Sequence, residues 1–159
     1  MQLLAYAAFV GLLGYLSQRP AYSYLKSNQA VIKLSIDQNG RHIGKCHRRT
    51  AAELAALPSY QRVPVVCPRR RYPVRVVLRL DGHLLYEQTR APAGIRRDGL
   101  SYVYARFTVP AGQHRLQARL WDDGPRADPA YERTSVITLR PAQVFVIESS
   151  SQDKAFIFR

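Results

Sequence analysis

Four residues near the middle of the chain have side chains that could ligate a metal or carry out redox chemistry: His42, Cys46, His47 and Cys67. Thiolate and imidazole are the usual ligands of zinc, so a metal site at these residues is one interpretation. Their spacing matches no zinc motif, and the adjacent Cys46 and His47 rarely reach the same ion. The chain also has no C-x-x-C pair, which thioredoxin-like chemistry and covalent haem attachment require. Metal or ligand binding by this His/Cys cluster is therefore kept as the alternative interpretation.

Cys46 and Cys67 are the two cysteines of the 159-residue chain, which favours a bond between them. A disulfide here would close a loop of about 20 residues and stabilise the fold by roughly 3 kcal/mol through chain entropy. Such bonds persist in oxidising compartments. We therefore expect a disulfide on a domain that faces the oxidising side of a membrane, with two reduced cysteines as the other possibility.

Basic residues gather around the two cysteines. The chain has 24 Lys and Arg against 11 Asp and Glu, a net charge of +13 that favours anionic partners. Residues 41–79 hold ten of the basic residues and a single acidic one, Glu53. The candidate basic patch consists of Arg48, Arg49, Arg69, Arg70, Arg71 and Arg75. A solvated surface is the simplest interpretation, and contact with anionic lipid headgroups or with an acidic protein is the functional one.

Other classes of function find little support. Nucleic acid is disfavoured, because single-strand binders interleave basic residues with exposed aromatics, and only Tyr60 and Tyr72 qualify near the patch. The acidic run at 122–128 lacks the spacing of an EF-hand loop, and the serines after Glu148 lack a G-x-S-x-G elbow. His83 and His114 are expected at turn edges as solvated residues. We expect no catalytic residues, no cofactor and no metal.

The N-terminal residues Leu3–Leu16 form an uncharged, mostly apolar run of 14 residues. Such a run is short for a membrane span, which needs about 20 residues. We expect residues 1–18 to be an uncleaved membrane anchor and residues 19–29 a tether. The alternatives are a signal peptide cleaved near residues 21–23 and a helix packed on a soluble core.

Two opposed signals bear on the orientation of the domain at a membrane. Arg19, Lys26 and Lys33 follow the apolar run and no Lys or Arg precedes it, which by the positive-inside rule places the domain in the cytoplasm. The cysteine pair and the strand-rich pattern favour the periplasm. We expect a single-pass inner-membrane protein with its domain in the periplasm, and keep the cytoplasmic face as the alternative.

The remaining domain, residues 30–159, must position the side chains described above. Apolar and polar residues alternate in 30–37, 72–89, 101–121 and 131–150, which predicts strands, and 154–159 predicts a last one. A short helix is predicted between the cysteines, because Thr50 and Glu53 have the spacing of a capping box.

Turn signals predict how these strands are connected. Asn39-Gly40 and Asp81-Gly82 are hairpin signals, because both central residues of a type I′ turn need positive φ. The 110–113 turn also predicts a hairpin, and the 140–143 turn separates two more strands. At Asp81-Gly82 we expect a bulge that sets Leu80 opposite Leu84 and keeps the apolar face whole.

About eight short strands and one short helix predict a mainly β fold, an antiparallel β-sandwich. Two segments, LDGHLLYEQ (80–88) and FTVPAGQHRLQARL (107–120), stand out, and the second contains a PAGxHxL turn that enters a strand. In this they resemble small immunoglobulin-like or PEGA-like sandwich modules of the bacterial envelope. The resemblance implies an immunoglobulin-like fold and a binding or scaffolding role.

These observations together predict a non-catalytic, membrane-anchored periplasmic β-sandwich protein. It would act as an accessory, assembly or scaffold subunit of a membrane complex, with a protein partner or anionic lipid headgroups as its contacts. The alternative is a periplasmic metal- or ligand-binding module that uses the His/Cys cluster of residues 42–67.

Overall fold

The computed structural model describes residues 2–18, 25–124, 128–150 and 155–159. Its elements follow one another along the chain as α1 (Gln2–Gln18), β1 (Gln29–Gln38), β2 (His47–Arg48), α2 (Ala51–Ala55), the 3-10 helix η1 (Ser59–Gln61), β3 (Val65–Val66), β4 (Val74–Leu80), β5 (His83–Arg90), β6 (Ser101–Pro110), β7 (Gly112–Trp121), β8 (Tyr131–Leu139), β9 (Val144–Ser150) and β10 (Ala155–Phe158). The predicted strands are confirmed, and the fold is mainly β.

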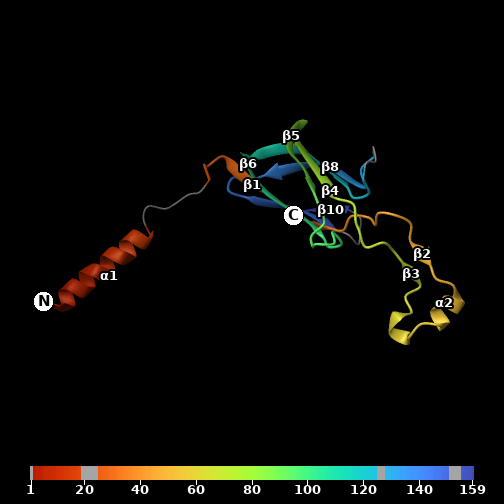
Figure 1. Ribbon diagram of the computed structural model, residues 1–159. Coiled ribbons are helices and arrows are strands. Elements are labelled where there is room, and N and C mark those ends of the chain that lie inside the picture. The colour runs from red at the N-terminus through yellow and green to blue at the C-terminus, as the bar shows by residue number, and fades with distance from the viewer. Residues whose placement is uncertain (1, 19–24, 125–127, 151–154) are drawn as a thin grey trace.

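The strands form two four-stranded sheets and one small two-stranded sheet (Figure 1). The first large sheet has the order β10-β9-β1-β6 and the second has the order β5-β4-β7-β8, while β2 pairs with β3. Neighbouring strands run antiparallel except β1 and β9, which are parallel. This parallel pair departs from the antiparallel arrangement that was expected from the sequence.

One hydrophobic core is shared by the two large sheets. The alternation seen in the sequence places one face of each central strand in this core: Ile32, Leu34 and Ile36 of β1 are buried, and so are Leu116, Ala118 and Leu120 of β7. Burial of these apolar side chains provides the main favourable term in folding. The polar and charged residues between them lie on the outer faces.

The hairpin predicted at 101–121 is wrong, although both of its strands exist. Strand β6 pairs with β1 in the first sheet, and β7 pairs with β4 and β8 in the second. Ala111 alone separates the two strands, and its N–H donates to the carbonyl oxygen of Asn28. The chain therefore crosses from one sheet to the other at this point. Strands β8 and β9 are separated in the same way, at residues 140–143.

The hairpin predicted at Asn39-Gly40 is also wrong, because β1 has β6 and β9 as its neighbours and the chain continues into a loop. The hairpin at Asp81-Gly82 is confirmed: these residues have φ of 54° and 83° and join β4 to β5. Leu80 lies opposite His83 rather than Leu84. The expected bulge is present further from the turn, where the register shifts between Leu78 and Arg79.

Helix α1 has no buried residue and stands apart from the sheets (Figure 1). Its 17 residues carry no charge. Among the described helices, none has the length and apolar character needed to cross a membrane. The predicted tether lies largely outside the described residues, as does the predicted signal-peptide cleavage site.

Candidate anion-binding site

A disulfide joins Cys46 and Cys67, as predicted. The bond closes the segment 46–67, which we call the arm, and which contains β2, α2, η1 and β3. Figure 1 shows the arm projecting away from the two large sheets. No residue of α2 or η1 is buried, so the arm is held by its own bonds rather than by the core.

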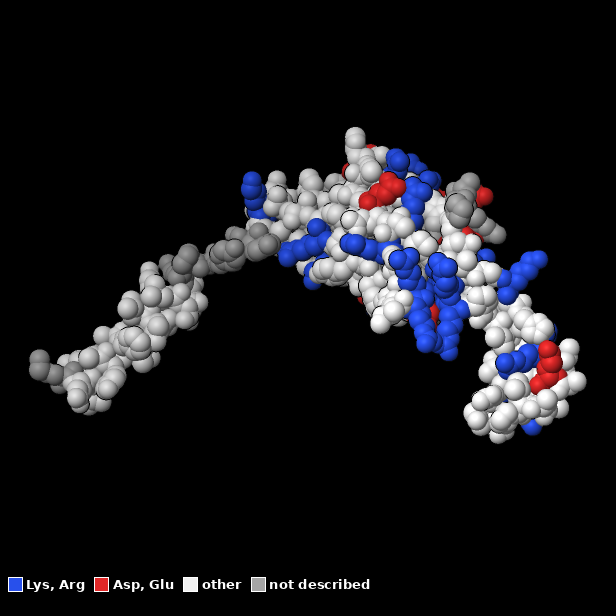
Figure 2. All heavy atoms as spheres, in the orientation of Figure 1, with Lys and Arg blue, Asp and Glu red and all other residues white. Residues whose placement is uncertain are grey.

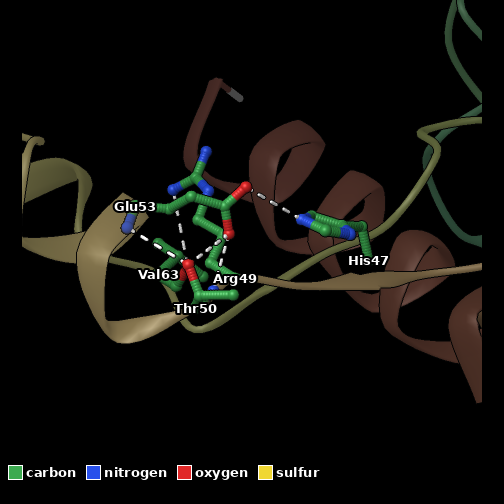
Figure 3. Close-up of polar contacts among 5 residues, drawn as sticks. All are labelled: His47, Arg49, Thr50, Glu53 and Val63. Atoms are coloured by element: carbon green, nitrogen blue, oxygen red, sulfur yellow. Dashed lines mark hydrogen bonds and ion pairs between the residues drawn. The ribbon is translucent and has the colours of Figure 1, made fainter.

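The predicted capping box starts the arm's short helix (Figure 3). The backbone N–H of Thr50 donates to Glu53 Oε2 at 2.6 Å, and the N–H of Glu53 donates to Thr50 Oγ1 at 3.3 Å. His47 Nε2 lies 3.4 Å from the other carboxylate oxygen, Glu53 Oε1. The hydrogen bond from the Thr50 backbone is the main reason that the pKa of Glu53 lies below its ordinary value.

Two arginines tie the arm together. Arg49 Nη1 donates to the carbonyl oxygen of Gln61 at 2.9 Å, and Arg62 Nε donates to that of Leu57 at 2.9 Å. A guanidinium group used in this way stabilises a loop that lacks a core of its own. Arg49, a residue of the predicted basic patch, therefore has a structural contact inside the arm.

The alternative His/Cys cluster loses its thiolates to the disulfide. Of its two imidazoles, that of His42 contacts the carbonyl oxygen of Pro68 through Nδ1 at 2.6 Å, and that of His47 faces Glu53. Within the described residues, no group of three or more His, Cys, Asp or Glu side chains is arranged to hold a metal ion.

The six residues of the predicted basic patch do not form one surface. Arg71 is half-buried and donates to the carbonyl oxygens of Gly40 at 2.9 Å and Asp98 at 3.1 Å. Arg75 lies on β4, forms an ion pair with Glu87 at 2.6 Å, and places its guanidinium carbon 4.8 Å from the centre of the Trp121 ring. Both guanidinium groups therefore have contacts within the fold.

Arg69 and Arg70 belong to a different cluster, which includes two arginines that the sequence analysis overlooked. A cleft of about 630 Å³ lies between the segment after Cys67 and the loop 93–99. We call it the arginine cleft, and its lining consists of Ile43, Pro68, Arg69, Arg70, Ile95, Arg96 and Arg97. Figure 2 shows Lys and Arg side chains projecting from the body next to the arm, with little acidic surface between them.

Hydrogen bonds between three segments position the cleft. The N–H of Ile43 donates to the carbonyl oxygen of Arg70 at 2.8 Å, and the N–H of Arg71 donates to that of Arg97 at 3.1 Å. Inside the loop, the N–H of Arg97 donates to Gly94 at 3.0 Å. Gly94 has a φ of 87°, which favours glycine, and Arg97 adopts a φ of 53°. Backbone hydrogen bonds therefore hold the segment with Arg69 and Arg70 next to the loop with Arg96 and Arg97.

The four guanidinium groups of the cleft are not neutralised from within the fold. Arg69, Arg70, Arg96 and Arg97 make no side-chain hydrogen bond or ion pair with any described residue. Asp98 is the acidic residue of the loop. Arg41, by contrast, lies 3.9 Å from Asp122 and 3.7 Å from Asp123. The cleft thus places four guanidinium groups that have no described partner beside the apolar side chains of Ile43, Pro68 and Ile95.

A second pocket, more polar, lies beside the first at the end of β1. Its lining includes Gln38, Arg41, Asp122 and Tyr131, and its volume is about 650 Å³. Gln38 Nε2 donates to the hydroxyl oxygen of Tyr131 at 3.0 Å. Burial is the main cause that raises the pKa of Tyr131, and the charge of Asp122 adds to it. Within this pocket, Gln38 and Tyr131 are thus bonded to each other.

A signal for Arg96 and Arg97 was present in the sequence. The stretch GIRRDG repeats the arginine doublet of PRRRYP, but it lies outside the charge-rich range 41–79. The hydrogen bonds of Arg71 to the carbonyl oxygens of Arg97 and Asp98 bring the two arginine runs together. Comparison of the chain with protein-family models, with curated proteins and with solved structures finds no significant match.

Proposed function

We propose that the chain is a non-catalytic β-sandwich protein of the cell envelope, of the immunoglobulin-like kind, that is held at a membrane by its N-terminal segment. It acts as an accessory, assembly or scaffold subunit of a membrane complex. The anchor comprises residues 1–18, the tether 19–29 and the domain 30–159. The domain faces the periplasm, with the cytoplasmic face as the alternative.

The exposed surface of α1 is the observation that carries this proposal. The helix exposes large apolar side chains along its whole length, with Leu3 at 85% and Tyr15 at 62% of full exposure. Apolar surface of this extent is costly in water and marks contact with a membrane or a protein. The absence of charge from the helix favours the membrane.

The sandwich assignment is supported by the core that the two large sheets share and by the chain's crossings between them. Strands that switch sheets at short connections, as β6 and β7 do, are typical of Greek-key sandwiches. The disulfide supports an oxidising compartment, because glutathione and thioredoxin keep cytosolic thiols reduced.

The exposed apolar surface of the arm favours a protein as the partner. It exposes four apolar side chains near its disulfide, and three of these lie in the short stretch 63–66: Tyr60, Val63, Val65 and Val66. A disulfide-closed loop loses little entropy when it docks, because it is already constrained. No catalytic role is assigned to any residue.

The intact mass of the full chain extracted from native membranes tests the proposal. The expected result is recovery in the membrane fraction, uncleaved, with a mass that rises by two hydrogens on reduction. Cross-linking before extraction should then capture a membrane protein through the arm. Recovery only in the soluble fraction would contradict the membrane attachment, and free thiols in the native protein would contradict the periplasmic location.

A further inference from the structure

The loop 93–99 exposes an apolar residue, Ile95, next to two arginines. Ile95 is fully exposed, at 105% of its reference value, and Arg96 and Arg97 follow it directly. Amphipathic surface elements that combine apolar with basic side chains bury the apolar ones at the boundary between lipid headgroups and acyl chains. We propose that the arginine cleft binds the phosphate headgroups of an anionic phospholipid bilayer, with Ile95 entering the interface. This inference does not rest on the membrane attachment proposed for α1.

The charge of the cleft suits a phosphate group. A guanidinium group presents its N–H donors in a planar fork that matches two phosphate oxygens. Four such groups line one cleft, two from each of the segments that frame it. Because none has a partner among the described residues, a phosphate would not have to displace an internal ion pair. Arg71 and Arg75 could not serve in this way, since each is already engaged.

The apolar residues of the cleft favour a lipid bilayer over a nucleic acid or free phosphate as the source of the bound phosphate. Ile43, Pro68 and Ile95 lie among the four arginines. A bilayer offers phosphate and hydrocarbon in adjacent layers, so the arginines can bind phosphate groups while Ile95 is buried among the acyl chains. A nucleic acid offers phosphate but would leave Ile95 in water, and among the described residues no aromatic side chain lines the cleft to stack on a base. Free phosphate would also leave the apolar surface exposed.

The loop is ordered before it meets a ligand. The N–H of Ala93 donates to the carbonyl oxygen of Leu100 at 2.9 Å, and the N–H of Gly99 donates to that of Ala93 at 3.0 Å. These bonds close the base of the loop, while Arg71 holds its far side through Arg97 and Asp98. A preformed loop pays little ordering entropy on binding. Side-chain substitutions at its tip should therefore alter binding without disturbing the fold.

The cleft lies far from the point where the chain arrives from α1. Strand β1 begins at Gln29, whose carbonyl oxygen accepts from Ala142, and it ends beside Gly40, whose carbonyl oxygen accepts from Arg71. Ten residues of strand, roughly 33 Å, separate the two ends. The uncharged helix should contribute equally to neutral and anionic membranes, so the difference between them reports on the cleft.

Flotation of the full chain with vesicles tests the proposal. The vesicles contain phosphatidylcholine alone or phosphatidylcholine mixed with phosphatidylglycerol, at low and at high salt. We expect at least about tenfold stronger binding to the anionic vesicles at low salt, and loss of this difference in R69Q/R96Q, which removes one arginine from each segment. The control R115Q/R140Q removes the same charge outside the cleft and should retain the difference. Equal loss in both variants would mean that only net charge matters, and would overturn the proposal.

Two further measurements identify the source of phosphate. Hydrogen exchange of residues 93–100 in the floated protein should slow on anionic vesicles and not on neutral ones, even where α1 alone carries the chain onto both. I95S should weaken binding to anionic vesicles. If I95S has no effect and inorganic phosphate competes, the cleft is a free-anion site. If an oligonucleotide competes better than anionic vesicles do, it is a nucleic-acid site. Either result overturns the lipid assignment. If the protein does not float with neutral vesicles, that result contradicts only the membrane attachment proposed for α1 and not the lipid binding proposed for the cleft.

Discussion

The imidazole of His114 and the carboxylate of Asp81 lie in contact, with Nδ1 2.7 Å from Oδ2, and they join the start of β7 to the turn between β4 and β5. The second ring nitrogen, Nε2, lies 3.0 Å from the carbonyl oxygen of Pro110. Only 12% of the His114 side chain is exposed, so the expectation of a solvated surface histidine was wrong. Both ring nitrogens face acceptors, an arrangement that favours the doubly protonated ring.

This contact predicts a dependence of stability on pH. The hydrogen bond to Asp81 raises the pKa of His114, and the same bond lowers the pKa of Asp81. The contribution of His114 is complete below its unfolded pKa of about 6.5 and is lost as pH rises through the raised folded pKa. The contribution of Asp81 is present above about pH 4 and is lost as pH falls through its lowered folded pKa.

His114→Gln should therefore lower the free energy of unfolding most at pH values between the lowered pKa of Asp81 and the raised pKa of His114. The urea unfolding midpoints of the wild type and H114Q should differ more at about pH 5 than at about pH 9, because the contribution of His114 is lost as pH rises through its raised folded pKa. His83→Gln is the control, because the His83 side chain makes no hydrogen bond or ion pair with a described residue and acts on Asp81 only through its charge, so the pH dependence in this variant should be much weaker. A constant difference between wild type and H114Q at both pH values would contradict the assignment.

The disulfide should stabilise the whole domain although the arm lies outside the core. Both ends of the arm are held by the domain, since His42 pairs with Arg71 and the N–H of Ile43 donates to Arg70. Folding must therefore close this loop whether or not the bond exists. Cys46→Ala/Cys67→Ala should lower the free energy of unfolding by about 2–3 kcal/mol, measured with urea. An unchanged free energy would mean that the ends of the arm separate freely in the native state.

The sequence alone was sufficient to locate the strands but not to pair them. Alternation determines which side chains of a strand face the core, and Leu34, Val103 and Leu116 are buried as their positions predict. Both large sheets bury one face in the same core, so the local pattern is equally compatible with either sheet. Whether the chain turns back or crosses over at Ala111 depends on backbone pairing with β1 and β4, which are distant in the sequence.

The candidate site was predicted in part for a related reason. Charge density along the chain marked Arg69 and Arg70, which line the arginine cleft, but it also included Arg71 and Arg75, whose guanidinium groups reach internal acceptors. It missed Arg96 and Arg97, which lie close only because their loop is bonded to the segment after Cys67. The disulfide could be predicted because two cysteines allow one pairing.

Gly40 is expected to tolerate no side chain. A Cβ at this position would collide with the carbonyl oxygen of Tyr72, and the N–H of Tyr72 is bonded to Arg41, so the backbone cannot easily give way. Gly40→Ala should lower the free energy of unfolding by about 2 kcal/mol or more. Gly14→Ala in α1, where no atom lies within 4 Å of the added Cβ, is the control and should leave it unchanged. Equal unfolding midpoints for the two variants would refute the collision.

Arg75 should matter for stability through Trp121 more than through Glu87. The ion pair with Glu87 is exposed, at 48% and 42% of the two side chains, and such pairs contribute about 0–1 kcal/mol. The contact with the Trp121 ring adds a cation–π interaction of about 0.5–1 kcal/mol. Arg75→Gln loses both contacts, while Glu87→Gln loses only the first and leaves the guanidinium over the ring. Urea unfolding should therefore rank Arg75→Gln as the more destabilising change, and Trp121, the single tryptophan, should change its fluorescence in that variant alone. Equal losses of stability with unchanged fluorescence would show that the ring contact contributes nothing.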